Sequence, residues 1–134
     1  MAFLLSKILC MSYIRFNPNP TNKNIGDCVV RAFCAAFDSD WDDAYMRLCL
    51  RGYIMKDMPS SNCVWDSELM AEGYKREILP FRTNYTVKDF CEEHKYGTYI
   101  LGTGTHAVAV IDGNYYDAWD SGNEIPTYFY RKER

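Results

Sequence analysis

The stretch THAVAVIDGNYYDAW, residues 105–119, decides the fold because it contains a β-hairpin whose register can be counted. Two runs rich in β-branched and aromatic residues flank Asp112-Gly113, a dipeptide typical of two-residue hairpin turns. Such a turn fixes the pairing of the two strands. The predicted pairs are Ile111 with Asn114, Val108 with Asp117, and His106 with Trp119.

The same register predicts which side chains share a face, because successive side chains of a strand alternate between the two faces. His106 and Asp117 are diagonal neighbours on one face, at roughly 7 Å between their backbone positions. A carboxylate beside a histidine fixes the tautomer of the ring and raises its basicity. Asp117 is therefore the predicted partner of His106. The residues predicted to share this face are His106, Val108, Val110, Tyr115, Asp117 and Trp119.

Upstream of the hairpin, most of the periodic segments are helical. Apolar residues recur at helical spacing after the capping candidates Asp27, Asp40, Ser61 and Thr86. Gly52 and Gly73 are the expected stops of the second and third helices. The predicted helices are 28–37, 41–52, 61–72 and 86–94, and the predicted strands are 13–16, 74–79, 98–103, 105–111, 114–119 and 126–131. This order favours an α+β domain, with N-terminal helices packed on a C-terminal, mostly antiparallel sheet.

Composition limits the classes of function. The 134 residues are 48% hydrophobic and 16% aromatic, which is typical of one ordered globular domain. The formal net charge is −3 and the basic residues are scattered, so nucleic-acid binding is excluded as the main activity. No spacing of ligands resembles a zinc or calcium site, and no cofactor-binding motif is present. We expect neither a metal nor a cofactor.

Residues 13–134 are predicted to form this single domain, and residues 1–12 an N-terminal extension. The extension lacks the basic region and cleavage site of a signal peptide and is too short to span a bilayer. Met11 is an alternative translation start. We expect no membrane association and a cytoplasmic location with reduced thiols, because the six cysteines show no C-x-x-C pair and no dense framework.

Cys28 is the cysteine whose position favours chemistry. It follows Gly-Asp as the first residue of a predicted helix, in NIGDCVVRAFCAAF, residues 24–37. Unsatisfied amides and the helix dipole lower the pKa of a thiol there from ~8.5 toward roughly 3.5–7.5. A lone cysteine is more often structural, but a His–Asp pair on a later hairpin favours a nucleophile. The others in the domain are interpreted as small core residues: Cys34, Cys49, Cys63 and Cys91.

The motifs GDCVVRAF and THAVAVIDGNYYDAWDSG, in this order, resemble those of the papain-like cysteine peptidase superfamily. With FNPNP they resemble, more narrowly, small papain-like proteins encoded by gut Firmicutes and their phages, from Tyr13 onward. The resemblance implies helices packed on an antiparallel sheet. It also implies that Cys28 is the nucleophile, that His106 is the base, and that Asp117 orients His106.

The remaining predicted site residues surround this triad. An oxyanion hole needs the Cys28 backbone amide and a side-chain donor from the preceding loop. The family has a glutamine six residues before the cysteine, where this chain has Asn22, and Asn24 is the rival. We interpret Trp119 as a lid on His106, and residues Gly104 and Thr105 as a wall where backbone approaches substrate. Arg31 is interpreted as a cross-link from the helix to a carboxylate.

Two classes of function follow. The first is a thiol hydrolase that acts on a peptide or isopeptide bond of a peptide or protein substrate, through an acyl-enzyme. The same apparatus can transfer the acyl group to an amine, as a transglutaminase-like enzyme does. The second class is a catalytically degenerate papain-like module that binds a protein partner. The reactivity of Cys28 discriminates between the two classes. The sequence does not indicate the oligomeric state.

Overall fold

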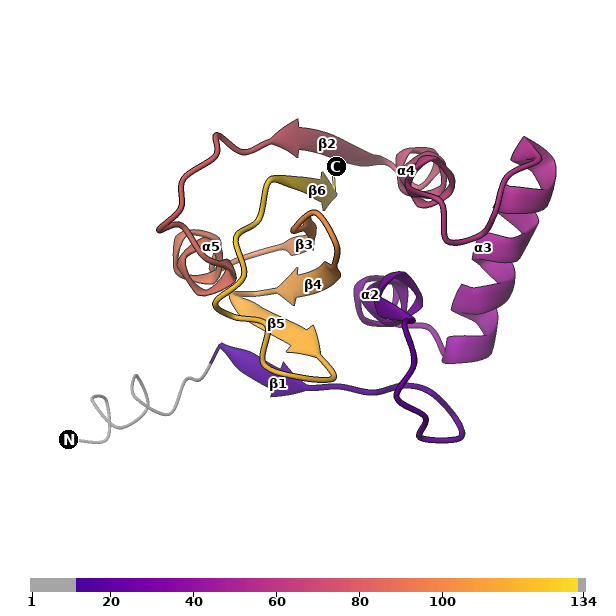
Figure 1. Cartoon of the computed structure of the whole chain (residues 1–134), viewed down its shortest axis with the longest axis horizontal. Helices are drawn as coiled ribbons and strands as arrows, with labels where there is room; N and C mark the ends of the chain where they lie inside the picture. Colours follow the sequence, from indigo (N-terminus) through magenta and orange to yellow (C-terminus); the bar gives the residue numbers. More distant parts are fainter. Residues whose placement is uncertain (1–11, 133–134) are drawn as a thin grey trace.

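A six-stranded sheet separates two layers of helices (Figure 1). The computed structural model describes residues 12–132, which form four helices and a mostly antiparallel sheet. The predicted α+β class is therefore confirmed. The helices are α2 (Cys28–Phe37), α3 (Trp41–Met55), α4 (Asn62–Ala71) and α5 (Val87–Glu93). The strands are β1 (Tyr13–Arg15), β2 (Tyr74–Ile78), β3 (Thr98–Gly102), β4 (Ala107–Ile111), β5 (Asn114–Asp117) and β6 (Tyr128–Lys132).

The strand order is β1-β5-β4-β3-β6-β2. Every pair is antiparallel except β1 with β5, which is parallel. The pair β4–β5 lies near one end of this order, where it meets the first strand of the chain. The predicted turn is present, since Asp112 and Gly113 both have positive φ angles of 51° and 81°. Ile111 pairs with Asn114 as predicted.

The predicted sharing of one face along the whole hairpin is wrong. Val108, Val110 and Tyr115 pack in the apolar cluster with α5, whereas the Asp117 side chain contacts Arg31 of α2. The paired ladder ends at Ala109 and Tyr116, so the predicted partners of Val108 and His106 are not in it. Beyond this ladder Asp117 still pairs with Arg15 of β1 and Ala107 with Gly102 of β3. A register counted from the β4–β5 turn therefore does not extend to His106 and Asp117.

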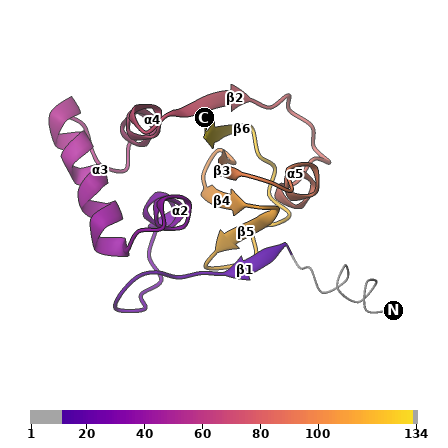
Figure 2. The ribbon, with the colours of Figure 1, turned by 180° about the vertical axis from the view of Figure 1, so that it is seen from behind.

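Three helices cover one face of the sheet and α5 covers the other (Figures 1 and 2). Helix α2 packs on β4 and α4 packs on β2, while α3 lies outside them and contacts both. The larger apolar cluster fills the space between these helices and the sheet, around Phe33, Leu48, Trp65 and Tyr130. This packing fixes the N-terminus of α2 against the start of β4.

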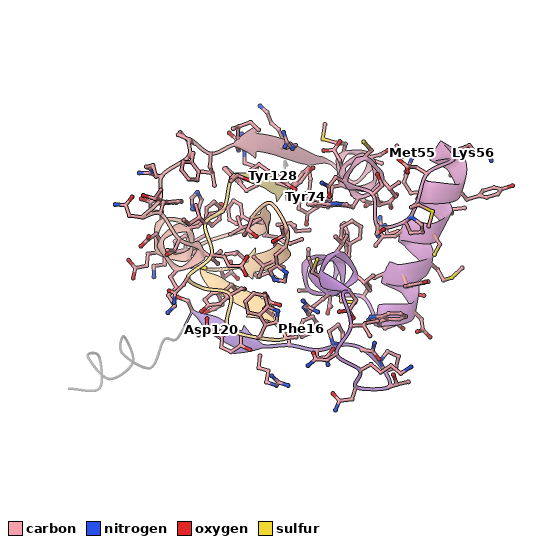
Figure 3. All side chains as sticks on the ribbon, in the orientation of Figure 1. Phe16, Met55, Lys56, Tyr74, Asp120 and Tyr128 are labelled. Carbon is pink, nitrogen blue, oxygen red and sulfur yellow. The ribbon has the colours of Figure 1, made fainter. Side chains whose placement is uncertain are left out.

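Gly52 does not end α3 as predicted. The helix continues to Met55, and Lys56 ends it in the left-handed conformation with a φ angle of 59°. Figure 3 shows Met55 and Lys56 at this end of α3. Glycine stands at position 52 because the chain returns closely there: a Cβ atom would lie 2.7 Å from the carbonyl oxygen of Asp57. The glycine serves a close approach rather than a helix stop.

The cysteine predictions are confirmed in part. Cys34 and Cys91 are buried, Cys49 is half-buried and Cys63 is exposed. The prediction of a core position is wrong for Cys63, because α4 turns its neighbours Val64 and Trp65 inward instead. The predicted extension, residues 1–12, lies outside the described residues except for Ser12. None of the helices within residues 12–132 is both long enough and apolar enough to cross a membrane.

Candidate active site

Three elements bring the predicted triad together. Cys28 is the first residue of α2, His106 precedes β4, and Asp117 ends β5. The Nε2 atom of His106 lies 2.6 Å from Oδ2 of Asp117. The Cys28 thiol is hydrogen-bonded to the His106 ring and to the backbone amide of Ala107. Since Nε2 is engaged by the carboxylate, Nδ1 is the ring nitrogen left for the thiol.

The pKa values of these groups move toward an ion pair. Burial alone raises the pKa of the Cys28 thiol, but the hydrogen bonds from His106 and Ala107 and the positive charges of His106 and Arg31 lower it below its ordinary value. Burial alone lowers the pKa of His106, yet Asp117 and Cys28 raise it to about 9 through hydrogen bonds and charge. A thiolate beside an imidazolium is therefore favoured between these two pKa values.

Asp117 is fully buried, and each of its oxygens has defined partners. Burial raises the pKa of this carboxyl, but hydrogen bonds from His106 and Ser121 and the charges of His106 and Arg31 hold it below the usual range. Oδ1 accepts from Arg31 and from the Ala118 amide at 2.8 Å. Oδ2 accepts from Ser121 Oγ and faces His106. Asp117 is therefore held as an oriented carboxylate.

Asp27 occupies the predicted N-cap of α2, but its carboxylate makes no capping hydrogen bond. The Oδ1 atom accepts from Arg31 at 2.7 Å and Oδ2 accepts from the Trp41 indole at 2.9 Å. The first-turn N–H groups of a helix have no intrahelical acceptor. Because Asp27 is engaged elsewhere, the Cys28 amide is not capped by this side chain and is available to an oxyanion.

A pocket of about 420 Å³ lies beside Cys28 and His106. Its walls come from the N-terminus of α2, from α3 and α4, from the turn between α3 and α4, and from the loop before β4. Much of the lining is apolar or aromatic. Its large members are Ile25, Trp41, Tyr45, Leu48, Met58, Trp65 and Tyr128.

The structure brings some of the surrounding predicted residues to the pocket and not others. Gly104 and Thr105 line the pocket. Of the loop before α2, only the last residues line it, from Ile25 onward. Asn22 and Asn24 are exposed and outside this lining. The loop 17–26 is closed on itself, since Asn22 donates its backbone N–H to Asn19. The structure therefore brings neither asparagine into the pocket lining, and the side-chain oxyanion donor stays a prediction.

Trp119 packs on the His106 ring, with 4.9 Å between ring centroids, and is itself 46% exposed. It contacts His106 as predicted but lies outside the pocket lining, and its role as a lid stays a prediction. Two contacts of Asp117 were not predicted. Ser121 follows it by four residues in DAWDSG, a turn-like sequence that places a hydroxyl near the carboxylate. Arg31 cross-links α2 to a carboxylate as interpreted, but the identity of that carboxylate depends on tertiary packing.

Comparison of the chain with models of known protein families, with curated proteins and with solved structures gave no match. The geometry of the site therefore carries the functional argument.

Proposed function

We propose that this protein is a cysteine-dependent hydrolase of papain-like fold that acts on a peptide or isopeptide bond. One observation carries the proposal: Cys28, His106 and Asp117 form one hydrogen-bonded chain at the edge of a pocket. The chain order and the helix-leading position of the cysteine support a papain-like arrangement. A nucleophile, a base and a group that orients the base are the parts that acyl transfer requires.

The residues can perform the reaction in two steps. The Cys28 thiolate attacks the carbonyl carbon, and the Cys28 amide donates to the oxygen that becomes negative. As the C–N bond breaks, the His106 imidazolium gives its proton to the leaving amine, which leaves a thioester on Cys28. His106 then takes a proton from water, the hydroxide attacks the thioester, and the thiolate departs. An amine in place of water would give acyl transfer.

Alkylation by iodoacetamide tests this proposal without a known substrate. The rate is measured over a range of pH by mass spectrometry at each cysteine. We expect Cys28 to react rapidly below pH 7, because its pKa is lowered and only the thiolate reacts. Exposed Cys63 is the internal reference. In His106→Ala, we expect labelling of Cys28 below pH 7 to fall by about tenfold or more.

The control is Cys28→Ala, which should lose the fast label while its fold and the slow label at Cys63 remain. Substrates are then sought among peptide and isopeptide libraries with the wild-type protein. Labelling of Cys28 no faster than of Cys63 would contradict the hydrolase proposal, and it would favour a degenerate module that binds a protein partner.

A further inference from the structure

Arg31 lies between the nucleophile's helix and the triad carboxylate, and it is 5% exposed. Its NH1 atom lies 2.7 Å from Oδ1 of Asp27, while NH2 lies 3.0 Å and Nε 3.1 Å from Oδ1 of Asp117. Burial of a guanidinium is costly unless its donors are paired. Here the fork is shared by two buried carboxylates, one on each side of the helix–sheet boundary.

We propose that Arg31, held by Asp27, is a positioning residue of this site, which fixes the orientation of Asp117 and favours the thiolate form of Cys28. The proposal rests on the proposed function, because it assigns a role within the same triad. Arg31 itself is not part of the pocket lining and reaches it only through Asp27.

The two carboxylate oxygens of Asp117 have different partners, and this fixes the orientation of the side chain. Arg31 and the Ala118 amide occupy Oδ1, so that Oδ2 is the oxygen presented to His106. Rotation of the carboxylate would break the contacts of Oδ1 and the Ser121 hydrogen bond at once. The His106 ring is therefore aligned by a carboxylate that Arg31 holds. Without the guanidinium, Oδ1 loses its charged partner and the carboxylate is less restrained.

The anchoring of Arg31 comes from its own helix. Asp27 precedes Cys28, and Arg31 follows one turn later, so that the pair spans the turn that carries the nucleophile. The Trp41 indole of α3 holds the second oxygen of Asp27. The distance between Cys28 and Asp117 is thereby set by a rigid series of contacts rather than by long, free side chains.

The ionised groups that face the thiol decide how easily it loses its proton. Cys28 and Asp117 are negative, His106 is positive, and Asp27 adds a negative charge from the N-terminus of α2. Tyr128 of β6 is also close but stays neutral, since burial raises its pKa. Arg31 cancels one of the three negative charges. Its removal would make ionisation of the Cys28 sulfur less favourable beside the two carboxylates.

The test compares the pH midpoint of iodoacetamide alkylation at Cys28 in the wild type, Arg31→Met and Arg31→Lys. We expect Arg31→Met to raise the midpoint by about one pH unit and to slow labelling at pH 6 by about tenfold. Arg31→Lys should fall between the two, because one ammonium keeps the charge but cannot bind both carboxylates with a fork.

Arg47→Met is the matched control, because Arg47 pairs with the nearly buried Glu68 on α4, away from the thiol. We expect it to lower stability without moving the midpoint. If Arg31 is only structural, both Arg31 variants should lose stability with an unchanged midpoint, as Arg47→Met does. That result would overturn the positioning role, and the hydrolase proposal would stand. If wild-type Cys28 reacts like Cys63, both proposals are overturned. If Arg31→Met does not fold, an unchanged midpoint in Arg31→Lys would overturn the positioning role.

Discussion

At the scale of single residues, the chemistry depends on whether the Cys28 sulfur or the His106 ring holds the proton that the two groups can exchange. The Cys28 thiol has a lowered pKa and the His106 ring has one of about 9. Both shifts favour the proton on the ring over the proton on the sulfur. The buried carboxylate of Asp117 stabilises the charged ring, and its own pKa is lowered by the same contacts. The three residues titrate as one coupled unit.

The ring proton can be observed directly by NMR, because the chain has two histidines. We expect the ring signals of His106 to titrate near pH 9, and those of His94, which bonds the Phe90 carbonyl outside the site, to serve as the reference. Asp117→Asn removes the negative charge that favours the imidazolium, so the His106 pKa should fall. Hydrolysis should lose activity above this pKa, where the leaving amine lacks its proton donor. An Asp117→Asn titration identical to that of the wild type would contradict the coupling.

At the scale of elements, the sequence predicted the features that depend on interactions between neighbouring residues. The Asp112-Gly113 turn and the Thr86 cap of α5 form as predicted, because turn conformation and first-turn hydrogen bonds depend on neighbouring residues. The bond partners of Asp27 could not be predicted in this way. Its carboxylate prefers Arg31 and Trp41 to the amides of its own helix, and that choice depends on how α2 packs on α3 and β5.

The candidate site shows the same division. Cys28, His106 and Asp117 could be found from a helix start and a counted hairpin register. The position of Asn22 and Asn24 outside the pocket lining could not be predicted, because the loop 17–26 has no periodic pattern and its path is set by its own turns. The face prediction failed where the strand ladder ends, at Ala109 and Tyr116. His106 and Asp117 lie beyond this ladder, so a register counted from the turn does not settle how they face each other.

The hairpin turn should be sensitive to substitution at Gly113. This residue has a φ angle of 81°, and a Cβ atom would lie 3.3 Å from the Cys91 carbonyl oxygen. We expect Gly113→Ala to lower the free energy of unfolding in urea by about 1–2 kcal/mol, because a side chain is strained in this conformation. Gly26→Ala is the control, since nothing lies within 4 Å of its added Cβ. Equal stability of the two variants would contradict a turn that requires glycine.

At the scale of the whole molecule, the pocket lies where the N-terminus of α2 meets α3, α4 and the starts of β4 and β6. Its walls combine Trp41 and Tyr45 of α3, Trp65 of α4 and Tyr128 of β6 with the turn that contains Met58. These elements are separated along the chain, so the chemistry of the pocket is a property of the fold. The charged groups in the lining are Asp27 and His106, and both are engaged in the site network.

Such a lining should select the side chain next to the bond that is cleaved. We expect peptides with Phe or Leu at that position to react at least about tenfold faster than those with Lys or Glu, because burial of an unpaired charge among apolar walls is costly. Tyr45→Lys puts a cation at the rim, where Tyr45 is 44% exposed, and should shift the preference toward Glu. Tyr53→Lys is the matched control on the same helix, because Tyr53 is exposed and outside this lining. If the wild type cleaves Lys and Phe peptides at equal kcat/KM, substrate does not enter this pocket, and the chain must bind along another surface that reaches Cys28.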